Sequence, residues 1–129
     1  MYGIVVSEFN PSITKALLKE CLRGFKKQKI DPIVVEVPGA AEIPYAAQHL
    51  IQKYPKIKAI VALGAVIKGD TDHYEHVCRI CSEGLTQVSL KHHVPIVFEV
   101  LMTQTTADAK KRTFKGYEAA FVATHMGNL

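Results

Sequence analysis

Four short apolar runs recur along the chain and constrain its fold more than any other feature. They occupy residues 4–6 (IVV), 33–35 (IVV), 59–63 (AIVAL) and 96–98 (IVF). None of them alternates apolar with polar residues, as a strand with one face in water would. Continuous apolar runs are typical of strands buried on both faces of a parallel sheet. We therefore expect a parallel sheet with helices on both of its faces.

Helical patterns separate the apolar runs. Asn10 can cap and Pro11 can begin a first helix, in which one apolar stripe contains Ile13, Leu17, Leu18, Cys21, Leu22 and Phe25. A second helix is expected from about Glu42. A third should begin near Asp72, which has the spacing of a capping box to Glu75.

A fourth helix should begin near Thr105 or Thr106 and contain the basic residues that end at Arg112. The order of elements is then βαβαβαβα. Because crossovers between parallel strands are right-handed, the simplest sheet has strand order 2-1-3-4. We predict one α/β domain over residues 1–129, a flavodoxin-like three-layer sandwich. Its ligands should bind beyond the carboxyl ends of the strands.

Length and composition exclude several classes of protein. The 129 residues suit one domain, no apolar run approaches the roughly 20 residues of a membrane span, and no signal-peptide pattern is present. A soluble, cytoplasmic protein is expected.

The net charge is +4, but the lysines are scattered, so neither nucleic acid nor a membrane is an expected partner. Three cysteines without a secretory context argue against a disulfide framework.

The segment from Gly64 to His73 (GAVIKGDTDH) follows the third predicted strand and is the most informative one. Gly69 permits a ligand to approach the backbone closely, while Asp70 and Thr71 supply amide groups and a hydroxyl. The positive end of the next helix dipole favours a phosphate at this position. A plain turn with a capped helix is the commoner explanation of an isolated Gly-x-Thr.

His73 adds a titratable group in the first turn of that helix. The helix dipole disfavours a positively charged imidazole there and helps to keep the ring neutral. A neutral imidazole can accept a proton in catalysis. The alternative is a surface histidine without a chemical role.

Cys78 and Cys81, with His73 and His76 before them, suggest zinc or thiol redox chemistry at first sight. At about 100° per residue on a helix, the four side chains point in widely separated directions and cannot converge on one metal ion. Redox pairs also open a helix, whereas Cys78 lies more than one turn inside. We interpret both cysteines as structural, with Cys81 on the same face as Val77, and expect no metal.

Three further residues have both a structural and a functional explanation. Phe9 can be a core residue or an aromatic platform for a heterocycle. Glu42 can interact with a helix dipole or accept hydrogen bonds from substrate hydroxyls. Arg112 can lie on a solvated basic face or hold a phosphate through two parallel hydrogen bonds.

Taken together, these segments resemble the 6,7-dimethyl-8-ribityllumazine synthase family. The resemblance extends from the first strand to the last helix. Its most specific block is residues 64–75, and the other matching segments are residues 7–10 (SEFN), 38–44 (PGAAEIP) and 95–101, together with Arg112.

The resemblance implies the condensation of 5-amino-6-ribitylaminouracil with 3,4-dihydroxy-2-butanone 4-phosphate, without a metal or a redox cofactor. It implies that His73 moves protons. It also implies that the pyrimidine and ribityl groups contact Phe9, Ala40, Ala41, Glu42, Ala65 and Val66. The phosphate is expected at Gly69, Asp70, Thr71 and Arg112.

The family further implies a homo-oligomer, either a pentamer or an assembly of pentamers, with active sites between subunits. Phe98, Arg112 and Lys115 are then expected to reach into the site of a neighbouring subunit. Three other functions remain open at this point. They are a receiver-type signalling domain, a non-catalytic relative that binds a flavin or forms a shell, and the related archaeal riboflavin synthase.

Overall fold

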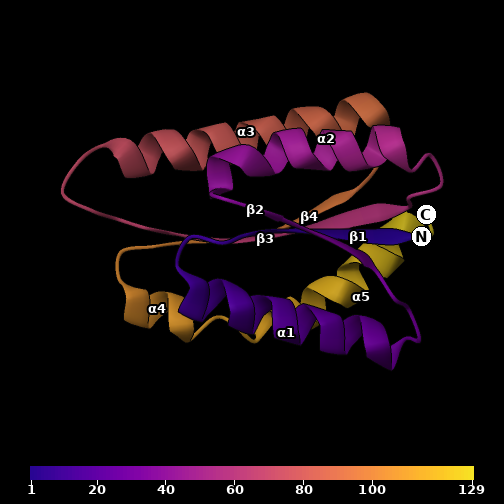
Figure 1. Ribbon diagram of the computed structural model, residues 1–129, viewed down its shortest axis with the longest axis horizontal. Coiled ribbons are helices and arrows are strands. Elements are labelled where there is room, and N and C mark those ends of the chain that lie inside the picture. Colours follow the sequence, from indigo (N-terminus) through magenta and orange to yellow (C-terminus); the bar gives the residue numbers. More distant parts are fainter.

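The computed structural model describes residues 1–129 as a four-stranded parallel sheet between two layers of helices (Figure 1). The strands are β1 (Tyr2–Ser7), β2 (Ile33–Val37), β3 (Ala59–Ile67) and β4 (Ile96–Thr103), in the order β2-β1-β3-β4. All three strand pairings are parallel. The predicted parallel sheet and its strand order are therefore confirmed.

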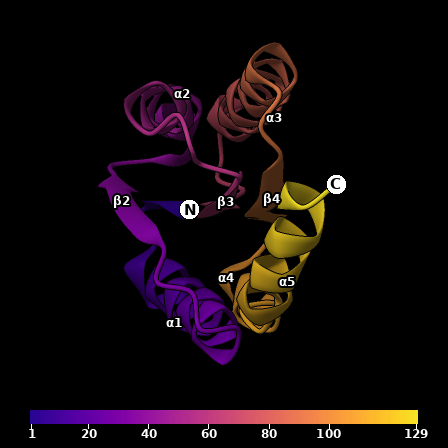
Figure 2. The same ribbon diagram turned by 90° about the vertical axis from the view of Figure 1, so that its right-hand side faces the viewer.

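The helices divide between the two faces of the sheet, as Figures 1 and 2 show. One face is covered by α1 (Pro11–Lys27), α4 (Thr106–Lys110) and α5 (Lys115–Gly127). The other is covered by the short 3₁₀ helix η1 (Ala40–Glu42), α2 (Ile43–Lys53) and α3 (His73–His92). This is the predicted flavodoxin-like, three-layer α/β architecture. None of these helices combines the length and the apolar character needed to cross a bilayer.

The two central strands separate two apolar cores. Ile4 and Val6 of β1 face α1 and α5, whereas Val5 faces α2 and α3. Every residue of β1 is buried, and so are the first seven residues of β3. Both edge strands differ from the expectation of burial on both faces, because Val34 and Glu36 of β2 and Phe98 of β4 are exposed. Nearly complete burial is confined to the two central strands.

Helix α1 begins as predicted at Pro11, whose fixed φ suits the first position of a helix. The predicted apolar stripe is confirmed. Four of its members are completely buried, and Leu18 and Leu22 pack against them at the margin of the core; the four are Ile13, Leu17, Cys21 and Phe25. Asn10 precedes the helix, but its side chain makes no capping hydrogen bond.

Helix α3 begins at His73 with Asp72 at its N-cap position, as predicted, but the predicted capping box is absent. The side chain of Asp72 accepts no capping hydrogen bond. Instead, the backbone N–H of His73 donates to the hydroxyl oxygen of Thr71 at 3.3 Å. Short hydroxyl side chains form such local turns readily, and here the threonine takes the place of the expected cap.

The predicted fourth helix is wrong in its extent, because the structure divides it into α4 and α5. Thr105 caps α4 as expected by accepting a hydrogen bond from the N–H of Asp108 at 3.1 Å. Four i→i+3 hydrogen bonds between residues 109 and 117 then tighten the chain into a turn. This turn brings Gly116 directly against the backbone of Leu17 on α1. Arg112 consequently lies in the turn between two helices rather than on a helix face.

Candidate active site

A cavity of about 330 Å³ opens at the carboxyl edge of the sheet, between β1 and β3. From β1 the chain crosses first to β2 on one side and later to β3 on the other. Ligands of doubly wound proteins bind at such a switch point. The walls come from the β1–α1 turn, the loop and 3₁₀ helix after β2, the end of β3 and the first turn of α3. The cavity thus lies at the rim where the sequence predicted a ligand.

Phe9 forms one wall from the β1–α1 turn. Its side chain is 72% exposed, so it is not a core residue. Its backbone N–H donates to the carbonyl oxygen of Pro38 at 3.0 Å, which ties the turn to the loop after β2. An aromatic ring with most of its surface free can stack on a flat ligand.

The loop after β2 supplies a second wall, formed by Ala40, Ala41 and Glu42. Gly39 is extended and the chain then closes into η1, where the N–H of Glu42 donates to the carbonyl of Gly39 at 3.2 Å. The small side chains of the two alanines leave room beside the backbone. The carboxylate of Glu42 is exposed at the cavity and can accept hydrogen bonds from a polar ligand.

The third wall is the segment between β3 and α3. Gly69, Thr71 and His73 all line the cavity and are exposed. No atom of the chain lies within 4 Å of the position that a Cβ would occupy on Gly69, so this stretch of backbone is open to a ligand. The first amides of α3 have no acceptor within the helix and lie beside Thr71. This arrangement suits an anion.

The direction of the backbone groups on β3 decides which of them reach the cavity. The N–H groups of Ile60 and Lys68 donate to carbonyls on the β4 side, at 3.0 Å each. Backbone groups of successive residues in a parallel strand face alternate neighbours. The amide of Val66 is therefore turned toward β4, whereas those of Ala65 and Ile67 face the β1 side. Since β1 ends at Ser7, the backbone N–H and carbonyl of Ile67 have no strand beside them and face the cavity.

Phe98, Arg112 and Lys115 do not reach this cavity within one chain. They line a second cavity of about 500 Å³ along the outer edge of β4. The guanidinium of Arg112 donates there to the carbonyl oxygen of Asp108 at 2.8 Å. Burial raises the pKa of Glu99 in the same cavity, although the positive charge of Lys115 acts in the opposite direction.

Asp70 is the remaining residue of the expected phosphate site, and it lies outside the lining of both cavities. Its side chain is exposed between Gly69 and Thr71, which do line the first cavity. Any contribution of Asp70 to a ligand at this site is therefore restricted to its backbone or to the mouth of the cavity.

Several residues that line the first cavity were not among the predicted site residues. Asn10 was expected to cap a helix, and no role in the site was predicted for Ile67, Tyr74 or Val77. Val77 lies one helical turn after His73, so the i, i+4 spacing on a helix could have identified it. No local pattern in the sequence identifies Ile67, because its place follows from the point at which β1 stops pairing with β3.

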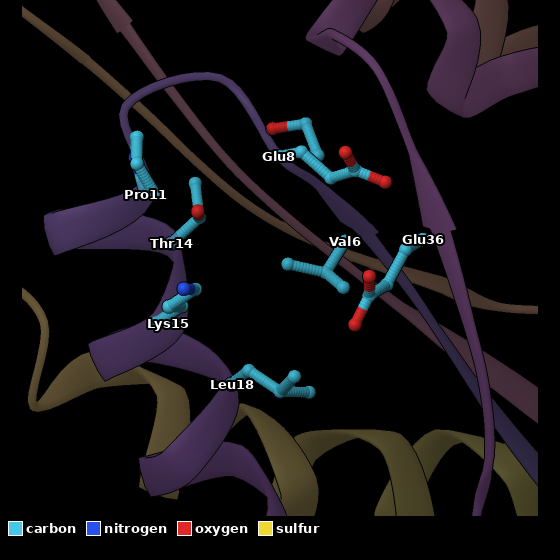
Figure 3. A pocket seen from close by; sticks show the side chains of 8 residues that line it. Val6, Glu8, Pro11, Thr14, Lys15, Leu18 and Glu36 are labelled. Atoms are coloured by element: carbon cyan, nitrogen blue, oxygen red, sulfur yellow. The ribbon is translucent and has the colours of Figure 1, made fainter.

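A third cavity, of about 370 Å³, lies on the opposite side of β1, between β2 and α1 (Figure 3). The carboxylate of Glu36 approaches it from β2, that of Glu8 from the residue after β1, and Lys15 approaches it from α1. Two carboxylates in one groove disfavour a phosphate, since like charges repel. The helix terminus beside Thr71 is therefore the better anion site.

The cysteines fit a structural interpretation. Cys21 and Cys81 are completely buried in the two cores, and burial raises the pKa of each thiol to about 12. Burial also raises the pKa of the partly exposed Cys78. No cluster of three or more His, Cys, Asp or Glu side chains is arranged to hold a metal ion. Raised pKa values make these thiols poor nucleophiles.

Sheet order and cavity position together define a class: a doubly wound α/β protein with a small-molecule site at the carboxyl edge of its sheet. A family model described as 6,7-dimethyl-8-ribityllumazine synthase matches residues 1–129. The chain belongs to this family, whose members are transferases of riboflavin biosynthesis. The family resemblance expected from residues 64–75 and the other matching segments is confirmed over the whole chain.

Proposed function

We propose that this protein condenses 5-amino-6-ribitylaminouracil with 3,4-dihydroxy-2-butanone 4-phosphate to give 6,7-dimethyl-8-ribityllumazine. One observation carries the proposal. A single cavity joins an exposed aromatic ring at Phe9, a carboxylate at Glu42 and a helix N-terminus with Thr71 and His73. A flat heterocycle, a polyol chain and a phosphate need these three kinds of group.

The reaction begins when the 5-amino group of the pyrimidine attacks the ketone of the phosphate substrate. Water leaves as the imine forms at C2. Removal of the proton on C3 then expels the phosphate from C4 and leaves an enol, which tautomerises to a ketone at C3. The ribitylamino nitrogen attacks this new carbonyl, and a second loss of water closes the ring. Each step moves a proton between nitrogen, carbon and oxygen.

His73 is the proposed proton carrier. Its imidazole is the one histidine side chain of the cavity lining, and it is exposed to the space where the substrates would meet. Stacking on Phe9 would hold the pyrimidine, and Glu42 with the backbone around Ala40 and Ala41 would bind the ring and its ribityl chain. Ala65 and Val66, which line the same cavity from β3, would complete this contact.

The departing phosphate is proposed to bind at the N-terminus of α3, on the backbone of Gly69 and Asp70 and on Thr71. Within one chain no arginine or lysine lines this cavity. Arg112, Lys115 and Phe98 line the separate cavity along β4, an edge strand whose outer side has no partner strand. We therefore propose that these three residues complete the site of an adjacent copy in a homo-oligomer, with a pentamer as the expected unit.

The direct test is an absorbance assay of the purified protein with both substrates and with a chelator in place of added metal. Formation of the ribityllumazine together with inorganic phosphate is the expected result. If saturating substrates give neither product, the proposed reaction is wrong. Binding of a flavin without turnover would indicate a non-catalytic relative instead.

A further inference from the structure

Asn10 occupies an unusual position between β1 and α1. Its backbone is left-handed, with φ 63° and ψ 60°, a conformation that non-glycine residues adopt rarely. Its side chain does not cap α1, although the sequence predicted that it would. The amide nitrogen Nδ2 donates instead to the carbonyl oxygen of Ala65 on β3, at 3.0 Å and 55 residues away.

This hydrogen bond replaces one that the sheet cannot make. β1 pairs with β3 as far as Val6 opposite Leu63. The backbone donors that follow β1, at Glu8 and Phe9, bond to carbonyls of Val37 and Pro38 on the β2 side. Neither of them reaches the carbonyl of the buried Ala65, which is 3% exposed. An unpaired carbonyl in such a place destabilises the fold, and the amide of Asn10 removes this penalty.

The same residue determines the position of Phe9. The carbonyl oxygen of Asn10 accepts hydrogen bonds from the N–H groups of Ile13 at 3.0 Å and Thr14 at 3.1 Å, which fixes the turn to α1. The ring of Phe9 is largely exposed and has little packing of its own to orient it. Its orientation therefore depends on the backbone on either side of it.

We propose that Asn10 is a positioning residue for this site. By joining the β1–α1 turn to β3, it fixes the gap between the ring of Phe9 and the β3 backbone from Ala65 to Ile67. A flat heterocycle enters this gap, so the width of the gap controls binding. The identity of that heterocycle rests on the function proposed above, but the link between the two segments does not.

Two substitutions test the link by kinetics. Asn10→Gly keeps the left-handed backbone and removes the donor, whereas Asn10→Asp keeps the size and the tolerance of that backbone but cannot donate when ionised. Both should raise the KM for the pyrimidine by about tenfold or more, since small misplacements in a site are costly. Unchanged KM values in both variants would overturn the proposal.

Asn128 provides the matched control. Its amide nitrogen donates to the carbonyl oxygen of Thr124 at 2.8 Å at the end of α5, away from the cavity. Asn128→Gly should leave the KM unchanged. A double-mutant cycle separates positioning from a general loss of structure: in a Phe9→Ala background, Asn10→Gly should have an effect of less than about twofold. Fully additive effects would contradict an action through Phe9.

A spectroscopic measurement makes the inference independent of catalysis. The chain contains no tryptophan, so a Phe9→Trp variant carries a single indole at the mouth of the cavity. Adding Asn10→Gly should lower its fluorescence anisotropy, because the turn loses its anchor on β3. An unchanged anisotropy overturns the role of Asn10. Absence of turnover in the unsubstituted protein overturns only the proposed reaction.

Discussion

His73 and Arg112 lie in different cavities of the same chain, and at the scale of single residues they are expected to affect different kinetic constants. An imidazole that moves protons acts mainly in the transition state. A guanidinium that holds a phosphate binds the ground state and the transition state alike. The two roles can therefore be separated by substitution.

We predict that His73→Ala lowers kcat by about 100-fold or more, because a positioned acid or base contributes about that much. We predict that Arg112→Ala mainly raises the KM for the phosphate substrate, by about tenfold to 100-fold, which corresponds to the loss of one charged hydrogen bond. Steady-state kinetics with each substrate varied separately measures both effects. Equal losses in kcat and KM for both variants would contradict the assignment.

Matched controls for these substitutions are available in the neighbouring positions. His76 is exposed on the same helix but does not line the cavity, and Lys111 precedes Arg112 without lining the cavity along β4. His76→Ala and Lys111→Ala should leave kcat and KM within about twofold of the unsubstituted protein, as surface substitutions usually do.

The two buried thiols should make the free energy of unfolding depend on pH in the alkaline range. Burial raises the pKa of Cys21 and Cys81 to about 12 in the folded chain, from an ordinary value of 9.0. Above about pH 9 the unfolded chain loses these protons while the folded chain keeps them, so rising pH favours unfolding. We expect the urea midpoint to fall between about pH 9 and pH 12, the window between the unfolded and the folded pKa. In a Cys21→Ala, Cys81→Ala variant, which has lower stability at neutral pH, this fall should be smaller.

At the scale of secondary structure elements, the contact between α1 and α5 depends on two glycines. A Cβ on Gly24 would lie 2.5 Å from the carbonyl oxygen of Tyr117 and 2.8 Å from the Cβ of Ala120. A Cβ on Gly116 would collide with the carbonyl oxygen of Leu17. The two helices therefore approach each other through their backbones. This contact determines where the turn that carries Arg112 lies.

We predict that Gly24→Ala destabilises the protein. Overpacking typically costs about 1–3 kcal/mol, which exceeds the gain of up to about 1 kcal/mol from the higher helix propensity of alanine. Thermal unfolding should show a Tm lower by several degrees, on the order of 2–8 °C. Gly69→Ala is the matched control for stability, since its Cβ would meet no atom within 4 Å. A lower Tm in both variants would refute this account.

The elements differ in how far the sequence predicts them. Apolar periodicity predicts α1 and the central strands correctly because burial on a fixed face leaves a fixed pattern. The division into α4 and α5 was missed because residues 107–112 (ADAKKR) are mostly good helix formers and continue the pattern of α4 past its end. What breaks the helix there is the close contact of Gly116 with α1, which is remote in sequence.

At the scale of the whole molecule, the proposed phosphate site is incomplete in one chain. The cavity beside Thr71 is lined by no lysine or arginine, and the cavity with Arg112 and Lys115 lies along β4, at one edge of the sheet. If two copies share a site, one contributes His73 and its neighbour contributes Arg112. Such an arrangement makes activity a property of the assembly.

We predict complementation between inactive variants. In oligomers refolded from equal amounts of the His73→Ala and Arg112→Ala chains, about a quarter of the shared sites should receive both intact side chains by random mixing. Activity at low concentrations of the phosphate substrate should then recover to about that fraction, whereas the activity of each variant alone stays well below it. Light scattering of the same samples should report a pentamer or a multiple of it. Failure to recover activity in mixed oligomers would place both residues in one chain's site.

The sequence alone determined the fold class, the strand order and the rim that holds the candidate site. Burial on both faces fixes the central strands, and the handedness of crossovers fixes the order of the sheet. The segment proposed to bind phosphate was identifiable because its residues are adjacent: Gly69, Thr71 and His73 line the cavity together. Each of these features follows from interactions between residues close in the chain or from rules that hold for every parallel sheet.

Only the tertiary structure decided how distant segments meet at the site. It separated Arg112, Lys115 and Phe98 from the cavity that contains His73, which no spacing in the sequence indicates. It also assigned the amide of Asn10 to Ala65 rather than to the start of α1. The physical reason is the same in both cases. Where β1 stops pairing and where α5 packs on α1 depend on contacts between elements, and local patterns do not encode such contacts.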